Sequence, residues 1–179
     1  MPSRRAGVLW GLLGVLAFSF TVPFTRVAVG GLSPLFIGSG RAVIAALLAV
    51  GALALTRQPL PQGRQWMRLL IVAGGVVAGF PLLTSYALVT VPATHGAVVV
   101  ALLPAATAVV AVIRTRERPP ASPRAARSIA GASRNGFATI GGGGFGHFEL
   151  ADLLLFGAVV GAAIGYAEGG MLSRELGSW

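Results

Sequence analysis

The sequence contains no cysteine and no lysine, and it has few acidic residues. Without cysteine, disulfide frameworks, thiol nucleophiles and thiolate metal sites are excluded. The 14 basic residues are therefore all arginine, a bias that points to codon usage rather than to a function. The five acids are Glu117, Glu149, Asp152, Glu168 and Glu175. Charged residues make up 11% of the chain, where soluble domains carry about 25%. This excludes an ordinary water-soluble enzyme, because so little charge cannot cover its surface.

Apolar residues dominate the chain instead. They make up 55% of its 179 residues, and the mean hydropathy is +0.80, which excludes a disordered chain. The formal net charge of +9 raises the question of nucleic-acid binding. Most arginines, however, lie in short segments between long apolar runs, which is the pattern of a membrane protein. We therefore expect a lipid bilayer around the chain and no nucleic-acid partner.

The apolar runs predict an all-α integral membrane protein with about six transmembrane helices, since a crossing helix needs roughly 20 apolar residues. Five strongly apolar runs lie at about 7–28, 32–55, 67–89, 93–113 and 150–172. A further segment, 128–146, is only weakly apolar, because it contains Arg134, Asn135 and many glycines.

The distribution of arginine between the loops predicts the orientation. Basic residues occur at the N-terminus, in 57–68 and in 114–127, whereas the turn after 67–89 and the stretch 141–152 contain none. Because cytoplasmic loops carry the excess of arginine, we expect a plasma (inner) membrane protein with a cytoplasmic N-terminus. The C-terminus is also cytoplasmic if six segments span the membrane.

Glu168 is the most informative polar residue within an apolar run. The preceding glycines Gly157, Gly161 and Gly165 recur every fourth residue, and Gly169 continues the series, so these small residues form a stripe for close helix packing. Glu168 follows Gly157 by eleven residues, a rotation of about 20°, which places it on the packed or cavity-facing side. It is either a proton or substrate site, or an interfacial carboxylate paired with an arginine.

Arg41 and three prolines also interrupt the apolar runs. Arg41 is expected to be buried within its span, roughly 12–14 Å from the outer end, where it needs either a structural ion-pair partner or an aqueous cavity. Pro23, Pro81 and Pro104 each remove a helix hydrogen bond and predict kinks. Broken helices near polar side chains are typical of transporter sites, although proline is also simply tolerated in membrane helices.

Signatures of enzymes and metal sites are absent from the sequence. The glycine run at 141–144 is not followed by Lys-Ser or Lys-Thr, so it is no P-loop. The sequence contains neither His-Glu-x-x-His nor Gly-x-Ser-x-Gly. We expect no catalytic residue, no cofactor and no metal.

Short motifs from Trp10 to Glu175 resemble, in order and spacing, the EamA branch of the drug/metabolite transporter superfamily. They are Trp10-Gly11, Phe18-Ser19-Phe20 with Pro23, Leu32-Ser33-Pro34 with Arg41, Ser85-Tyr86-Ala87-Leu88, Ala93-Thr94-His95-Gly96-Ala97, Leu103-Pro104, Arg116-Glu117-Arg118-Pro119, Gly165-Tyr166-Ala167-Glu168-Gly169-Gly170 and Ser173-Arg174-Glu175.

Members of that family have ten helices in two inverted five-helix repeats. The resemblance therefore implies a first repeat at 1–146 and the start of a second at 147–179. It also implies secondary transport, in the direction of efflux, of a small-molecule substrate, either a metabolite such as an amino acid or a drug. The residues that it implies for the substrate cavity are Ser19, Thr84, Ser85, Tyr86, Thr94, Thr107, Tyr166 and Glu168.

Two features depart from the family pattern. The fifth span is expected to be apolar, yet 126–144 contains several polar residues, and four more helices are expected after Trp179. Three interpretations follow: a fragment of a ten-helix exporter, a truncated, non-transporting remnant, or a half-transporter that needs a second copy or a complementary chain.

Overall fold

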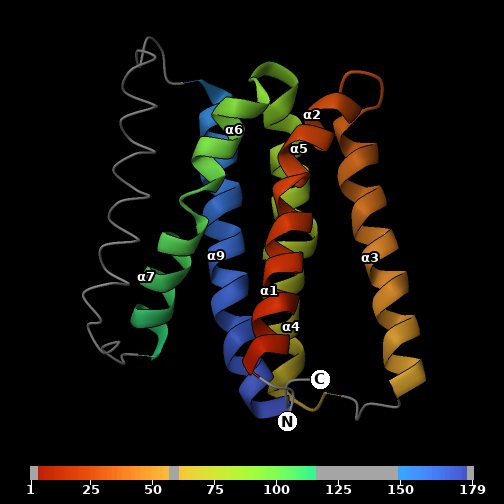
Figure 1. Ribbon diagram of the computed structural model, residues 1–179, viewed down its shortest axis with the longest axis vertical. Coiled ribbons are helices and arrows are strands. Elements are labelled where there is room, and N and C mark those ends of the chain that lie inside the picture. The colour runs from red at the N-terminus through yellow and green to blue at the C-terminus, as the bar shows by residue number, and fades with distance from the viewer. Residues whose placement is uncertain (1–3, 57–60, 116–148, 177–179) are drawn as a thin grey trace.

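The computed structural model describes residues 4–56, 61–115 and 149–176. In these residues all regular elements are helices, and they form a helical bundle (Figure 1). In chain order they are α1 (Arg4–Ser19), α2 (Thr21–Ala28), α3 (Pro34–Thr56), α4 (Arg64–Val72), the π-helix η1 (Ala73–Gly79), α5 (Phe80–Thr90), α6 (Ala93–Val100), α7 (Leu103–Thr115) and α9 (Leu150–Leu176).

Five helical stretches in the described residues are long and apolar enough to cross a membrane. They are Gly7–Ala28, Pro34–Thr56, Arg64–Thr90, Ala93–Thr115 and Leu150–Leu176. These stretches confirm the prediction of an all-α integral membrane protein and the five strong apolar runs, with ends shifted by a few residues. The predicted weak span at 128–146 lies outside the described residues, as does the predicted boundary between the repeats at 146.

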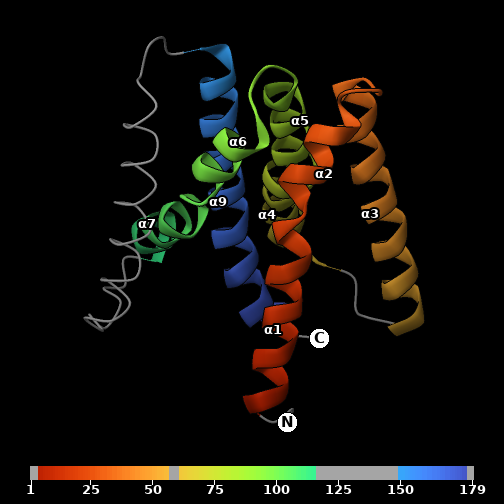
Figure 2. The ribbon, with the colours of Figure 1, turned by 45° about the horizontal axis from the view of Figure 1, so that its top comes forward.

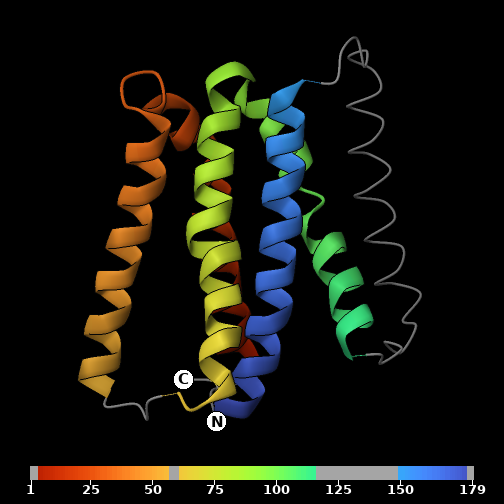
Figure 3. The same ribbon diagram turned by 180° about the vertical axis from the view of Figure 1, so that it is seen from behind.

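The two ends of the bundle carry different polar contacts. Figure 3 shows that α1 begins and α9 ends at the same end of the bundle. Toward this end Glu168 pairs with Arg68 and Arg114. At the other end, where α9 begins, His95 Nε2 lies 2.7 Å from Asp152 Oδ1. We call these the Glu168 end and the His95 end. His95 lies at the start of α6 and Arg114 at the end of α7, so the span formed by α6 and α7 runs in the same direction as α9.

Helix α9 lies at the centre of the packing. It contacts α4, η1, α5, α6 and α7, and it buries more of its surface than the other spans do. Its glycines allow the closest approach: a Cβ placed on Gly75 would overlap the carbonyl oxygen of Gly161, and one on Gly165 would lie 2.6 Å from Val76 Cγ2. The glycine stripe thus faces the helix formed by α4, η1 and α5.

Three of the long spans are interrupted close to prolines. The boundary between α1 and α2 lies at Phe20, three residues before Pro23, and α7 begins one residue before Pro104. The π-helix η1 ends two residues before Pro81, whose missing N–H cannot continue an α-helical ladder. A Cβ on Gly79 would lie 2.6 Å from the carbonyl oxygen of Gly74, so this wider turn needs glycine there.

Helices α1 and α3 lie at the periphery of the bundle, and Figure 2 shows α3 at its edge beside α2. The ring of Phe18 on α1 lies 6.0 Å from that of Phe80, yet most of α1 is exposed. Large apolar side chains such as Leu16 on α1 and Leu48 on α3 are likewise exposed. Lipid or another apolar chain must cover these helices, because water does not solvate such surfaces favourably.

Candidate functional site

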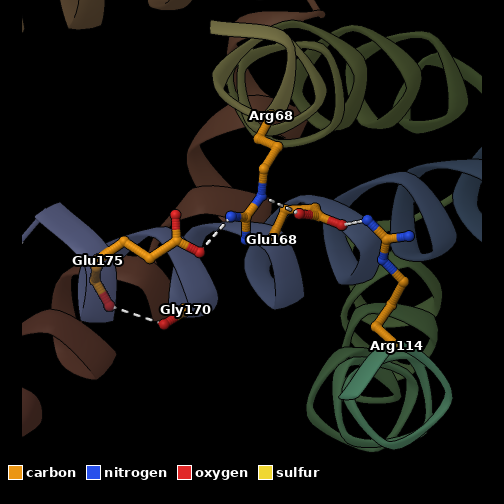
Figure 4. A network of polar contacts seen from close by, with 6 residues as sticks. Arg68, Arg114, Glu168, Gly170 and Glu175 are labelled. Carbon is orange, nitrogen blue, oxygen red and sulfur yellow. Dashed lines mark hydrogen bonds and ion pairs between the residues drawn. The ribbon is translucent and has the colours of Figure 1, made fainter. Parts of the chain in front are cut away.

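Glu168 on α9 is buried between two arginines from different helices (Figure 4). Its side chain is 1% exposed. Arg68 of α4 donates a hydrogen bond from Nε to Oε2 over 3.0 Å, and Arg114 of α7 donates from Nη2 to Oε1. Both carboxylate oxygens therefore accept charge-assisted hydrogen bonds, which join three spans at the Glu168 end.

Arg68 extends the contact to a second acid. Its Nη1 donates to Glu175 Oε1 over 2.5 Å, so one guanidinium bridges two carboxylates of α9. The four side chains, which we call the Glu168 cluster, are Arg68, Arg114, Glu168 and Glu175, and their formal charges sum to zero. This balance matters because an unpaired charge in a membrane-spanning segment is costly.

An open cavity adjoins the Glu168 cluster. It has a volume of about 520 Å³, which lies in the range of small-molecule sites. It is lined by Arg64, Gln65, Met67, Arg68, Ile71, Arg114, Glu168, Met171 and Glu175. A small molecule that enters this cavity meets the ion pairs that hold α4 and α7 to α9.

The predicted hydroxyl groups lie away from this cavity. Thr84 and Ser85 are buried in α5, where Thr84 Oγ1 donates to the Phe80 carbonyl and Ser85 Oγ to the Pro81 carbonyl, each over 2.6 Å. Thr107 in α7 and Ser19 in α1 also donate to carbonyls of their own helices, each over 2.8 Å. These side chains satisfy their hydrogen bonds locally.

The remaining candidates are exposed. Tyr86 and Tyr166 are 45% and 40% exposed, and Thr94 is exposed near the start of α6. Among the eight predicted cavity residues, Glu168 alone lines the cavity beside the cluster. Arg41 is partly buried in α3, where its Nη1 donates to Thr25 Oγ1 over 3.3 Å.

The sequence analysis expected an arginine beside Glu168 but did not identify which residues pair with it. Arg68 and Arg114 were interpreted as loop charges, and Glu175 only as part of a motif. A signal was nevertheless present, because Arg68 begins one span and Arg114 ends another on the side where the helix of Glu168 ends. Among the described residues, no group of three or more His, Asp or Glu side chains is placed to hold a metal ion.

Two comparisons with known proteins find transporters. Residues 5–123 match the model of the EamA-like transporter family. The chain is 45% identical over 183 residues to the "Uncharacterized transporter YdeK" of Bacillus subtilis (strain 168), an alignment that covers 100% of this chain and 62% of the relative. The chain thus spans less than two thirds of the length of that relative. No solved structure matches the chain.

The family match covers more than half of the chain and includes four of its five described spans. The helix that carries Glu168 lies beyond that match but within the alignment to the Bacillus relative. The family and the apolar helices together indicate an integral membrane protein of the transport class. The chain belongs to the EamA-like transporter family of the drug/metabolite transporter superfamily.

Proposed function

We propose that the chain takes part in secondary export of small metabolites, such as amino acids, or of drugs across the plasma membrane. Membership of a transporter family supports transport in general. The observation that carries the finer proposal is Glu168, a buried carboxylate held by two arginines at the wall of a small-molecule cavity.

The ion pairs of Glu168 offer a way to couple binding to a conformational change. They link α9 to α4 and to α7 at one end of the bundle. A proton on Glu168 would remove its charge, and an anionic substrate group would compete with it for Arg68 or Arg114. Either event weakens the contacts that join α9 to α4 and α7, so that these helices can move relative to one another, as alternating access requires.

The arginine distribution supports a cytoplasmic Glu168 end. Arg64, Arg68, Arg114 and Arg174 lie toward this end, whereas Arg26 lies near the opposite end. By the positive-inside rule, both described termini then face the cytoplasm. A cavity that opens beside Glu168 would receive its substrate from the cytoplasm, which is the direction expected of an exporter.

A further chain would complete the transport path. In the part of the chain that the structure describes, the hydroxyls of Tyr86 and Tyr166 have no hydrogen-bond partner, although both lie in membrane spans and are exposed. Polar groups facing hydrocarbon are unfavourable, so these faces suit a cavity closed by another chain. We assign 1–146 to a first repeat and 147–179 to the start of a second. A second copy or a complementary chain would supply the missing wall.

The test is export from bacterial cells that express the chain. Cells are loaded with a mixture of isotope-labelled amino acids or, separately, with ethidium, and the loss of each compound is followed by mass spectrometry or fluorescence. We expect the wild-type chain to export at least one compound faster than a vector control. Glu168→Gln should reduce that rate to the control level while the amount of protein in the membrane stays unchanged.

Glu149→Gln provides the matched control, because Glu149 is an exposed carboxylate just before the start of the same helix and does not line this cavity. This variant should retain most of the export. If Glu168→Gln exported as fast as the wild type, Glu168 would be a structural residue. If the wild type exported none of the compounds, export by this chain alone would be excluded, which favours either a non-transporting remnant or a need for a complementary chain.

A further inference from the structure

We propose that a second cavity, toward the His95 end, binds an organic anion with an aromatic body. This cavity has a volume of about 630 Å³ and lies between the α1–α2 segment and α3. Its lining includes Phe20, Thr21, Phe24, Thr25, Phe36 and Arg41. The site is separate from the Glu168 cluster and does not depend on the transport proposal.

Arg41 is the one charged residue among those that line this cavity. Its Nη1 donates to Thr25 Oγ1 over 3.3 Å, while the Thr25 hydroxyl donates its own hydrogen to the Thr21 carbonyl over 2.7 Å. Among the described residues, no carboxylate lies within ion-pair distance of Arg41. The guanidinium carries several further N–H donors, and in the described part of the chain this membrane-embedded cation has no counterion.

Apart from Thr21 and Thr25, the rest of the described cavity wall is apolar, and it is rich in aromatic rings. Phe20 and Phe24 stack with ring centroids 5.5 Å apart and an interplanar angle of 20°. Phe36 on α3 contributes a third ring, and all three side chains are largely exposed. The volume suits a drug-sized ligand whose ring packs against the phenylalanines, with its anionic group at Arg41.

The depth of Arg41 distinguishes such a ligand from a phospholipid head group. Arg41 follows Pro34, the first residue of α3, by seven positions, which places it about 10 Å along the helix from that end. A lipid phosphate stays at the level of the head groups, outside the hydrocarbon core. An organic anion with an apolar body can instead carry its charge below that level. The charge of Arg41 and its apolar surroundings therefore favour this occupant.

The test is equilibrium binding of radiolabelled 2-naphthoate to the purified protein in nanodiscs of phosphatidylcholine, with empty nanodiscs as the blank. The neutral analogue 2-naphthamide is measured in parallel. We expect saturable binding of naphthoate to the wild type. Arg41→Gln should weaken that binding about tenfold, because a charge-assisted hydrogen bond is lost. It should leave the weaker binding of naphthamide unchanged.

Arg26→Gln is the matched control, since Arg26 is a nearby cation whose Nη1 donates to the Val89 carbonyl and which does not line the cavity. It should change naphthoate binding by less than about twofold, as expected of an exposed charge. Arg41→Lys keeps the charge and should restore part of the affinity. If Arg41→Gln fails to insert, the preference of the wild type and of Arg41→Lys for naphthoate over naphthamide decides the question.

Two results would overturn the proposal. The first is equal naphthoate binding by the wild type and Arg41→Gln, or no saturable binding by the wild type, either of which would exclude an anion site at Arg41. The second is specific retention of phosphatidylglycerol, seen by native mass spectrometry, that depends on Arg41 and blocks naphthoate. This retention would assign the cavity to lipid instead.

Discussion

At the scale of the residue, the decisive feature is an acidic side chain, Glu168, buried between two arginines inside an apolar bundle. Burying Glu168 is costly, and the two arginines offset that cost through hydrogen bonds to both of its oxygens. Removing one partner of a buried ion pair leaves an uncompensated charge, which typically costs about 3–5 kcal/mol. Here the loss is smaller when one arginine is removed, because the other arginine still pairs with Glu168.

A double-mutant cycle tests this coupling. Arg68→Gln and Glu168→Gln are expected to destabilise the protein separately, and the double variant less than their sum, with a coupling energy of about 0.5–3 kcal/mol. The free energy of unfolding is measured in detergent by tryptophan fluorescence. Arg64→Gln serves as the control, because Arg64 lines the cavity without making an ion pair among the described residues. Its effect should add to that of Glu168→Gln. If the effects of Arg68→Gln and Glu168→Gln on the free energy of unfolding were additive, the contact between the two residues would contribute no stability.

At the scale of the element, the contact between η1 and α9 sets the positions of the Glu168 cluster. The backbones of the two helices approach most closely at Gly75 and Gly161, and Gly165 packs against Val76. Arg68 lies on the α4 segment that continues into η1, so this contact holds Arg68 opposite Glu168.

Substitution of Gly75 tests the role of this contact. Gly75→Ala places a methyl group on the Gly161 carbonyl, and the overpacking should cost about 1–3 kcal/mol of unfolding free energy. Gly74→Ala is a neighbouring control, because a Cβ at Gly74 meets nothing within 4 Å. Thermal unfolding of both variants in the same detergent gives the comparison. A Gly75→Ala variant as stable as Gly74→Ala would show that the helices do not approach so closely.

The spans were predictable from sequence, because the length of an apolar run limits where a helix can cross. The side of α9 that carries Glu168 was also predictable, since helical rotation relates it to Gly157. The π-helix was not, as it depends on how Gly79 and Pro81 pack within the folded bundle. The hydrogen bond of Thr84 to a carbonyl of its own helix α5 was not predictable either. The hydrophobic pattern alone does not show which face of a uniformly apolar helix is buried.

At the scale of the whole molecule, the four other described spans pack unequally against α9. Helices α4, α5 and α7 pack against it, whereas α1 and α3 remain peripheral and expose large apolar side chains. The two ends of the bundle also differ in chemistry, with the Glu168 cluster at one and the His95–Asp152 pair at the other. Export from the cytoplasm through the first cavity requires the Glu168 end to face inward.

The measurement that tests this claim most directly is the labelling of single cysteines in intact cells with a membrane-impermeant maleimide. The natural chain has no cysteine, so each introduced thiol reports alone. Gly31→Cys lies in the connection between α2 and α3, where a Cβ meets nothing within 4 Å, and Ser173→Cys lies exposed near the end of α9. We expect Gly31→Cys to react in intact cells and Ser173→Cys only after the membrane is opened. The reverse pattern, or reaction of both cysteines in intact cells, would contradict the proposed orientation and the export route that depends on it.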